Sequence, residues 1–251
     1  MQDTDYIFGL RAIIEAIREG RQIDKLFVKK DLQGELAAEM FALLREHHIV
    51  AQRVPVERLN RITRKNHQGA IAMLSAVTYH DLGQLVTGLY DEGVLPFVVV
   101  LDGITDVRNF GAIARTAECC GVNALVIAER GSVSVGGDAV KTSAGALLSL
   151  PVCRERSLTH AVRFLKDSGF QIVAVSEKAN GNYTLADYTG PVALVMGAED
   201  VGISPAVMEL CDTRVSIPMF GHIGSLNVSV AAGVMMYEVV RQRLNADLEV
   251  I

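Results

Sequence analysis

The first part of the chain alternates between helical and strand-like patterns of apolar positions. Leu10, Ile13, Ile14 and Ile17 recur at three- and four-residue spacing, which predicts a helix that ends near Gly20. A second helix with the same kind of pattern is predicted over residues 35–47. Short strands are predicted over residues 26–28, 49–54 and 70–74. Residues 1–75 therefore indicate a small α/β domain.

From residue 97 onward, strands and helices alternate regularly. The run 97–101 is wholly apolar, as is typical of a strand buried on both faces of a parallel sheet. Strands are predicted over residues 124–128, 171–176, 192–196 and 214–217, and helices over residues 109–120, 138–148, 157–167, 204–210 and 226–243. This alternation predicts an α/β domain over residues 96–251, in which ligands bind at the carboxyl ends of the strands.

Residues 76–95 separate these two patterned regions. The segment holds three glycines and mixed polar and apolar positions without a clear period. We predict that it is a linker.

Composition narrows the class of protein. Half of the residues are hydrophobic (50%) and 21% are charged, which is ordinary globular usage and excludes a disordered or collagen-like chain. The longest apolar runs are far shorter than the ~20 residues of a membrane span, and residues 1–5 carry acidic side chains instead of the basic start of a signal peptide. The four cysteines and six histidines form no zinc-binding spacing, so we expect no metal site and interpret the cysteines as core residues. A cytoplasmic protein is predicted.

The net charge of −5 conceals an uneven distribution. Residues 1–75 hold 12 Lys and Arg against 10 Asp and Glu, whereas the rest of the chain holds 12 against 19. Positive charge is concentrated in one segment, formed by Arg58, Arg61, Arg64, Lys65 and His67. Such a cluster could contact RNA phosphates, although charge alone favours a solvated basic surface.

The common nucleotide-binding and hydrolase motifs are absent from the sequence. There is no G-x-G-x-x-G, no P-loop and no G-x-S-x-G. Three other segments contain candidate chemistry. Asn109 and Arg115 lie near a strand-to-helix junction, where a carboxamide and a guanidinium suit an anionic group; alternatively, Arg115 pairs with a surface carboxylate.

The second segment contains Glu199 between Gly197 and Gly202, at the end of a buried strand. The glycines permit a tight turn or the close approach of a ligand. The alternative is a purely structural role in an ordinary strand-to-helix turn. The third segment runs from Ile217 to Ser229 through two glycines into a long helix. Its polar residues are also plausible helix caps, with Ser225 as the expected N-cap.

Taken together and in order, the three segments resemble the SpoU (TrmH) family of the SPOUT superfamily, which are S-adenosylmethionine-dependent RNA ribose 2′-O-methyltransferases. The matching runs are N-x-G-A-x-x-R-T-A, L-V-x-G-x-E-x-x-G and I-P-M…S-L-N-V-S-V-A. Ile7-Phe8-Gly9 and His67-Gln68-Gly69 are also similar to the RlmB-type 23S rRNA guanosine 2′-O-methyltransferases. One departure is Asp106-Val107, where the family usually has Asp-Pro.

The resemblance implies an L30e-like RNA-binding domain followed by a SPOUT domain with a deep trefoil knot. It also implies a homodimer that acts on 23S rRNA or a pre-ribosomal particle. It assigns the chemistry to Asn109, Arg115, Glu199 and Asn227, and cofactor contacts to Gly197, Gly202, Ile217, Met219, Ser225, Leu226 and Asn227.

Because the guanidinium of Arg115 stays protonated, we favour a phosphate clamp over a general base for this residue. Two alternatives to the rRNA enzyme remain open: a tRNA ribose 2′-O-methyltransferase and an RNA-binding homologue with weak catalysis.

Overall fold

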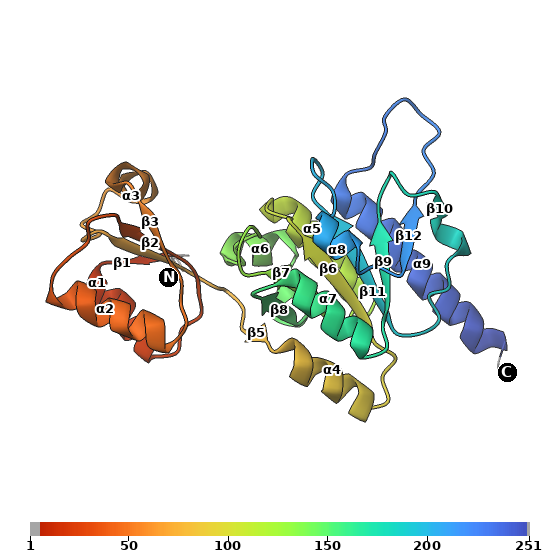
Figure 1. Cartoon of the computed structure of the whole chain (residues 1–251), viewed down its shortest axis with the longest axis horizontal. Coiled ribbons are helices and arrows are strands. Elements are labelled where there is room, and N and C mark those ends of the chain that lie inside the picture. Colours follow the sequence, from red (N-terminus) through yellow and green to blue (C-terminus); the bar gives the residue numbers. More distant parts are fainter. Residues whose placement is uncertain (1–5, 250–251) are drawn as a thin grey trace. The chain divides into compact units, whose positions relative to one another are not determined.

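The computed structural model describes residues 6–249, which form two compact units. The chain divides between Thr78 and Tyr79, and residues 134–138 group with the first unit. Figure 1 shows the elements of both units along the chain.

The first unit is built on a mixed four-stranded sheet. Its strands are β1 (Tyr6–Phe8), β2 (Ile23–Lys29), β3 (Ala51–Val54) and β4 (Ala70–Leu74), in the order β1-β4-β2-β3. β4 is antiparallel to both β1 and β2, whereas β3 is parallel to β2. The expected α/β domain is therefore present, with β1 as an additional strand.

Three helices flank this sheet. α1 (Leu10–Arg18) and α2 (Glu35–Glu46) bury their apolar residues against one face, as the three- and four-residue spacing predicts. The short helix α3 (Val56–Ile62) packs Leu59 against the opposite face. Helices thus pack on both faces of the sheet, but α3 covers much less of its face than α1 and α2 cover of theirs.

The segment predicted to be a linker contains regular structure instead. β5 (Tyr79–His80) pairs with a strand of the second unit, and α4 (Leu82–Asp91) follows directly. The Asp81 carboxylate caps α4 by accepting from the Gln84 amide, and Leu82 and Val86 are buried in the core of that unit. Two glycines inside the helix weakened its helical pattern, and burial of its apolar positions compensates.

The second unit holds an eight-stranded, wholly parallel sheet. In chain order its further strands are β6 (Phe97–Asp102), β7 (Ala124–Ala128), β8 (Val152–Glu155), β9 (Gln171–Val175), β10 (Gly181–Asn182), β11 (Val192–Gly197) and β12 (Thr213–Ser216). Across the sheet the order is β10-β12-β9-β11-β6-β7-β8-β5. The central strands β6, β7, β9 and β11 are buried almost throughout, as the apolar runs predict.

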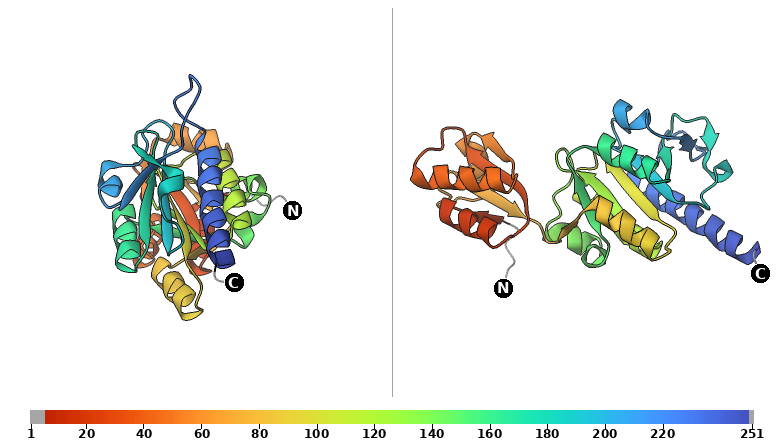
Figure 2. Two further views of the ribbon diagram at one scale, coloured as in Figure 1. Left: turned by 90° about the vertical axis from the view of Figure 1, so that its right-hand side faces the viewer. Right: turned by 60° about the horizontal axis from the view of Figure 1, so that its bottom comes forward.

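Helices cover both faces of this sheet (Figure 2). α4, α7 (Leu158–Asp167) and α8 (Pro205–Met208) contribute to a core on one face. α5 (Val107–Cys119) and α9 (Val228–Glu249) pack against each other on the other face. The remaining short helices are α6 (Gly137–Thr142), η1 (Ala146–Leu148) and η2 (Tyr183–Leu185). No helix of the described chain is long and apolar enough to cross a membrane.

Two predicted helices differ from the observed ones. The helix expected over residues 138–148 is split into α6 and η1, because Ala144 and Gly145 adopt positive φ angles of 53° and 90°. The helix expected from residue 226 begins at Val228. The Asn227 side chain accepts from the Ser229 amide at 3.0 Å, so Asn227 caps this helix and Ser225 does not.

Candidate functional site

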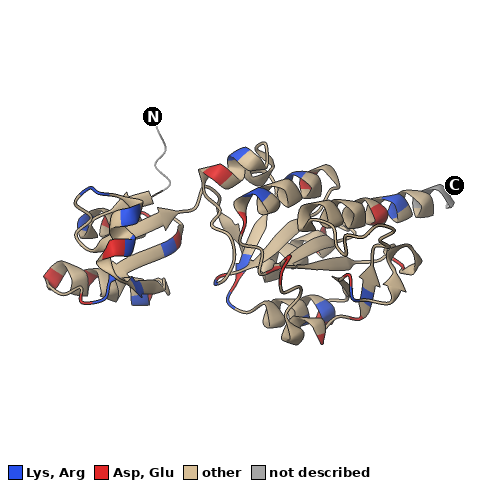
Figure 3. Ribbon diagram, turned by 90° about the horizontal axis from the view of Figure 1, so that it is seen from above, with Lys and Arg blue, Asp and Glu red and all other residues tan. Residues whose placement is uncertain are grey.

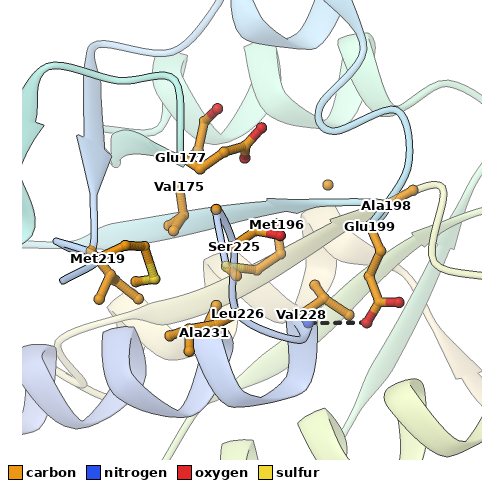
Figure 4. A pocket seen from close by; sticks show the side chains of 14 residues that line it. Val175, Glu177, Met196, Ala198, Glu199, Met219, Ser225, Leu226, Val228 and Ala231 are labelled. Atoms are coloured by element: carbon orange, nitrogen blue, oxygen red, sulfur yellow. Dashed lines mark hydrogen bonds between the residues drawn. The ribbon is translucent and has the colours of Figure 1, made fainter. Parts of the chain in front are cut away.

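A pocket lies where β9, β11 and β12 end and α9 begins (Figure 4). Its empty volume is about 570 Å³, which includes the open solvent at its mouth. Its lining is formed by Val175, Ser176, Glu177, Met196, Gly197, Ala198, Glu199, Ile217, Met219, Gly224, Ser225, Leu226, Val228 and Ala231. The pocket therefore occupies the carboxyl edge of the parallel sheet, as the alternating pattern predicts.

Most of the positions expected to hold a cofactor line this pocket. They are Gly197, Ile217, Met219, Ser225 and Leu226. Gly202 and Asn227 are not among the lining residues. The sequence reasoning missed Glu177, whose only signal was its position two residues after the end of the buried strand β9.

The two glycines around Glu199 shape the chain itself. The residues Ala198 and Gly202 pair as an isolated bridge, with the Gly202 amide donating to the Ala198 carbonyl at 2.8 Å. A Cβ on Gly197 would overlap the backbone of Gly202 and Ile203, and Gly202 has a φ of 74°. We expected Gly197 to make room for a ligand. In the structure, a glycine is required at this position because two backbone segments cross closely there.

The three sequence motifs meet in one hydrogen-bonded network beside the pocket. Glu199 Oε1 accepts from Asn109 Nδ2 at 3.2 Å and from Asn227 Nδ2. Asn227 Nδ2 also lies 3.0 Å from Asn109 Oδ1. These side chains come from α5, from the loop after β11 and from the residue before α9. Residues 118 positions apart in the sequence are thus in direct contact.

Glu199 also reaches the beginning of α9. Its Oε1 accepts from the Val228 amide at 3.2 Å, the interaction drawn in Figure 4. A carboxylate at this end of a helix satisfies a free amide and opposes the positive end of the helix dipole. The network therefore positions α9, which carries Val228 and Ala231 of the pocket wall.

α5 has its own cap directly before Asn109. Asp106 Oδ1 accepts from the amides of Arg108 and Asn109 at 2.8 and 2.9 Å. Val107 is the first residue of the helix, the position at which Pro is also well tolerated. The departure from Asp-Pro therefore leaves the cap and the start of α5 intact.

Arg115 lies apart from this network. Its side chain is exposed on α5, and within the described part of the chain no hydrogen bond or ion pair joins it to Asn109, Glu199 or Asn227. The surface carboxylate partner considered as an alternative is likewise absent among residues 6–249. Arg115 is thus available to an external anion.

The basic segment of the first unit divides into two kinds of residue. Arg58, Arg61, Arg64 and Lys65 are exposed. His67 is buried, and its ring lies 2.9 Å from Asn60 Oδ1 and accepts from the Gly69 amide at 3.0 Å. Because both ring nitrogens are engaged inside the unit, the structure favours a role for His67 in holding the turn before β4.

The four cysteines differ in their surroundings. Cys153 is buried as expected, but Cys119 is exposed on α5. Burial raises the pKa of Cys153 to about 12 and that of Cys120 and Cys211 to about 11, so these thiols stay protonated at neutral pH. No group of three or more metal-ligating side chains occurs among the residues that the structure describes.

The second unit is a parallel α/β unit with a ligand pocket at the carboxyl edge of its sheet. Its sequence lacks a dinucleotide-binding motif. The class of protein is therefore a ligand-binding α/β protein outside the common Rossmann type. Comparison identifies the family. A profile of the SpoU rRNA methylase family matches residues 96–237, and a profile described as RNA 2′-O ribose methyltransferase substrate binding matches residues 6–80. The chain belongs to the SpoU family.

Individual relatives agree with this assignment. A Staphylococcus saprophyticus protein assigned to the TrmH family of tRNA/rRNA methyltransferases is 36% identical over 94% of this chain and 95% of its own length. The S-adenosylmethionine complex of the SpoU methyltransferase AviRb from Streptomyces viridochromogenes is 27% identical, with a TM-score of 0.60 over 96% of this chain and 90% of that one. A TrmH/SpoU tRNA-modifying enzyme of A. aeolicus is 29% identical, with a TM-score of 0.54 over 66% of this chain and 86% of its own.

Proposed function

We propose that this protein transfers the methyl group of S-adenosylmethionine to the 2′-hydroxyl of a ribose in RNA. The observation that carries the proposal is the convergence of Asn109, Glu199 and Asn227, one from each family motif, in a single network beside the pocket. S-adenosylmethionine is the cofactor of the family and is bound in the related AviRb structure.

The residues of the pocket fit this cofactor. Val175, Met196 and Leu226 provide apolar surface of the kind that holds an adenine ring (Figure 4). Glu177 and Ser225 add polar groups at the same pocket, suited to the cofactor's amino and hydroxyl groups. When bound, S-adenosylmethionine supplies a methyl group already activated by its sulfonium, so the protein's task is to align the ribose hydroxyl and assist loss of its proton.

The protein's own residues divide this task. Asn109, Glu199 and Asn227 hold α5, the loop after β11 and α9 in one arrangement. Arg115, exposed and unpaired with that network, binds a phosphate next to the target ribose and orients the hydroxyl. The hydroxyl proton leaves to phosphate or water, because the guanidinium remains charged.

We further propose that the substrate is 23S rRNA, free or in a pre-ribosomal particle, and that the methylated nucleotide is a guanosine. The support is the description of the matching family as an rRNA methylase, together with the tRNA-modifying enzyme of A. aeolicus, which matches 66% of this chain where the AviRb structure matches 96%. The first unit supplies the contacts that distinguish the RNA, through Arg58, Arg61, Arg64 and Lys65. Such a substrate places the protein in the cytoplasm.

One assay tests both the reaction and the substrate. Purified protein with methyl-labelled S-adenosylmethionine is expected to label a 23S rRNA transcript more than total tRNA, with the label mapped to one ribose 2′-oxygen. Preferential labelling of tRNA would contradict the substrate assignment. Binding of RNA and cofactor without transfer to 23S transcript, ribosomal precursor or tRNA would instead identify an RNA-binding homologue.

We also infer that the chain between β11 and α9 forms the deep trefoil knot of the SPOUT superfamily. The support is the family profile over residues 96–237 and the sheet order, in which β12 follows β11 in sequence but lies beyond β9. Between β11 and β12 the chain therefore crosses the earlier strand β9.

A homodimer is the assembly that we propose. α9 carries exposed apolar side chains at Val230, Tyr237 and Leu244, which are 52%, 55% and 60% exposed. Their seven-residue spacing places them on one side of the helix. A stripe of this kind on a long helix favours burial against a second copy, and α5 with Arg115 packs beside it.

Tyr237→Glu is expected to convert the dimer to monomers, because two carboxylates would be buried at a two-fold interface. The molar mass in solution, measured by light scattering across a concentration series, would fall by half. Phe164→Glu is the control, since Phe164 is 37% exposed but lies on α7, in the helical layer on the other face of the sheet. A Tyr237→Glu protein that remains dimeric at low concentration would rule out this interface.

A further inference from the structure

The sheet of the first unit has two faces that are covered very differently. α1 and α2 together bury one face beneath a large apolar cluster. The other face is covered by α3, a helix of seven residues. A single short helix cannot cover a four-stranded sheet, so part of this second face remains accessible.

The strand register defines what this face displays. Tyr6 pairs with Met73, which in turn pairs with Lys25, so these three form one row across the sheet. The next row is Phe8, Ile71 and Phe27. Because strand side chains alternate between faces, both rows point to the same side, and the residues between them, such as Ile7 and Ala72, belong to the opposite core.

The two rows differ in burial. Phe27 and Ile71 lie in the small core beneath Leu59 of α3. Tyr6, Phe8 and Met73 pack only at its margin and are half-buried. A groove between α3 and the sheet continues this surface, with Phe27, Ile62 and Met73 among its lining residues. We call Tyr6, Phe8, Phe27 and Met73 the aromatic sheet face.

Cations surround this face. The Arg58 guanidinium carbon lies 5.0 Å from the centre of the Phe27 ring, and Lys65 Nζ lies 5.8 Å from the centre of the Phe8 ring. Arg61 lines the groove with Arg58, and Glu57 is the acidic residue of the same lining. Figure 3 marks the Lys and Arg positions of the chain in blue. Apolar rings and positive charge are therefore combined on one surface.

We propose that the aromatic sheet face binds an unpaired segment of the substrate RNA, with a base stacked at Tyr6 and Met73 and the flanking phosphates on Arg58, Arg61 and Lys65. Both the apolar side chains and the cations of this surface support RNA as the ligand. Base faces stack on aromatic and apolar side chains, and they are accessible only where the RNA is unpaired. Phosphates complement the cations. The inference rests on the proposed function, because it specifies which RNA the first unit selects.

Affinity of the full-length protein for RNA, measured without cofactor, tests this proposal. The probes are a single-stranded oligonucleotide containing 2-aminopurine and a duplex of the same sequence. Tyr6→Ala is expected to weaken single-strand binding by about five- to a hundredfold, the range for loss of one base–aromatic stack. Tyr6→Phe retains the ring and should bind nearly as the parent does.

The salt dependence of RNA binding distinguishes the contribution of the cations from that of the Tyr6 ring. Arg58→Gln with Arg61→Gln should reduce the slope of log affinity against log salt, whereas Tyr6→Ala should leave that slope unchanged. Arg11→Gln and Arg45→Gln are matched controls, because these exposed arginines lie on α1 and α2, over the other face. Both controls should bind as the parent protein does.

The outcomes separate this proposal from the proposed function. Unchanged affinity in Tyr6→Ala, or equal affinity for the duplex, would overturn the stacking surface even if methyl transfer occurs. Single-strand binding that depends on Tyr6 would support the surface even if no RNA is methylated. A change in oligomeric state of Tyr6→Ala with unchanged RNA affinity would show that the face binds protein, and would also overturn the proposal.

Discussion

Arg115→Ala is expected to lower the rate of methyl transfer by about 10²–10³-fold while leaving the affinity for S-adenosylmethionine nearly unchanged. A loss of this size is typical when one preorganised electrostatic contact to the reacting centre is removed. The cofactor affinity should persist because Arg115 is not among the residues that line the pocket. Single-turnover transfer and calorimetric binding on the same preparation measure the two effects separately.

Arg115→Lys distinguishes the two possible roles of this side chain. A phosphate clamp uses the planar fork of the guanidinium, so a lysine ammonium should restore little activity, without a strong dependence on pH. A general base would behave differently, because a lysine loses its proton near its reference pKa of about 10.4. Steep recovery of the lysine variant between about pH 8 and 10 would therefore refute the clamp and identify a base.

Arg163→Ala supplies the control for charge alone. Arg163 is exposed on α7, which belongs to the opposite helical layer of the sheet. Its replacement should leave both transfer and cofactor binding unchanged. If Arg163→Ala reduced transfer as much as Arg115→Ala, the effect would reflect general attraction of RNA and not a contact at the target ribose.

Gly197→Val is expected to weaken S-adenosylmethionine binding by about 10–100-fold or more. The new side chain cannot be accommodated, because even a Cβ would overlap the backbone of Gly202 and Ile203. The loop must shift, and Glu199 and the adjoining wall of the pocket move with it; overpacking of this kind costs about 1–3 kcal/mol and occasionally more. Calorimetric titration with the cofactor measures the loss, and a thermal melt shows whether the variant is folded.

Gly190→Ala is the matched control for this substitution. An added Cβ at Gly190 meets no atom within 4 Å, and the residue lies outside the pocket lining. It should therefore bind the cofactor as the parent protein does. Parent affinity in a folded Gly197→Val protein would show that the pocket described above is not where the cofactor binds.

The sequence predicted the wholly apolar strands better than the glycine-containing helix α4. β6 and β11 follow directly from apolar runs, since burial on both faces demands them. α4 was missed because Gly83 and Gly88 lower its intrinsic helix propensity. Its formation depends on Leu82 and Val86 being buried against strands from elsewhere in the chain. That stabilisation is tertiary and leaves no local signal.

Polar residues with several possible roles were the least predictable. Ser225 and Asn227 are both good N-caps, and only the position at which α9 begins shows that Asn227 serves as the cap. His67 belongs to a basic segment, yet its ring is turned inward to Asn60 and the Gly69 amide. A hydrogen-bond partner seven residues away cannot be inferred from composition or charge.

The sequence by itself determined the two-part organisation, the parallel α/β character of the second part and the identity of the motif residues Asn109, Glu199 and Asn227. The first two follow from burial periodicity and helix termini, whereas the motif residues follow from the resemblance of three ordered motifs to a known family. The tertiary structure decided which strand ends are neighbours. Because β9 lies between β11 and β12, Glu177 joins the pocket. Because β6 lies beside β11, Asn109 on the following helix reaches Glu199, where Asn227 also binds. Strand order depends on the path of the whole chain, which no local pattern encodes.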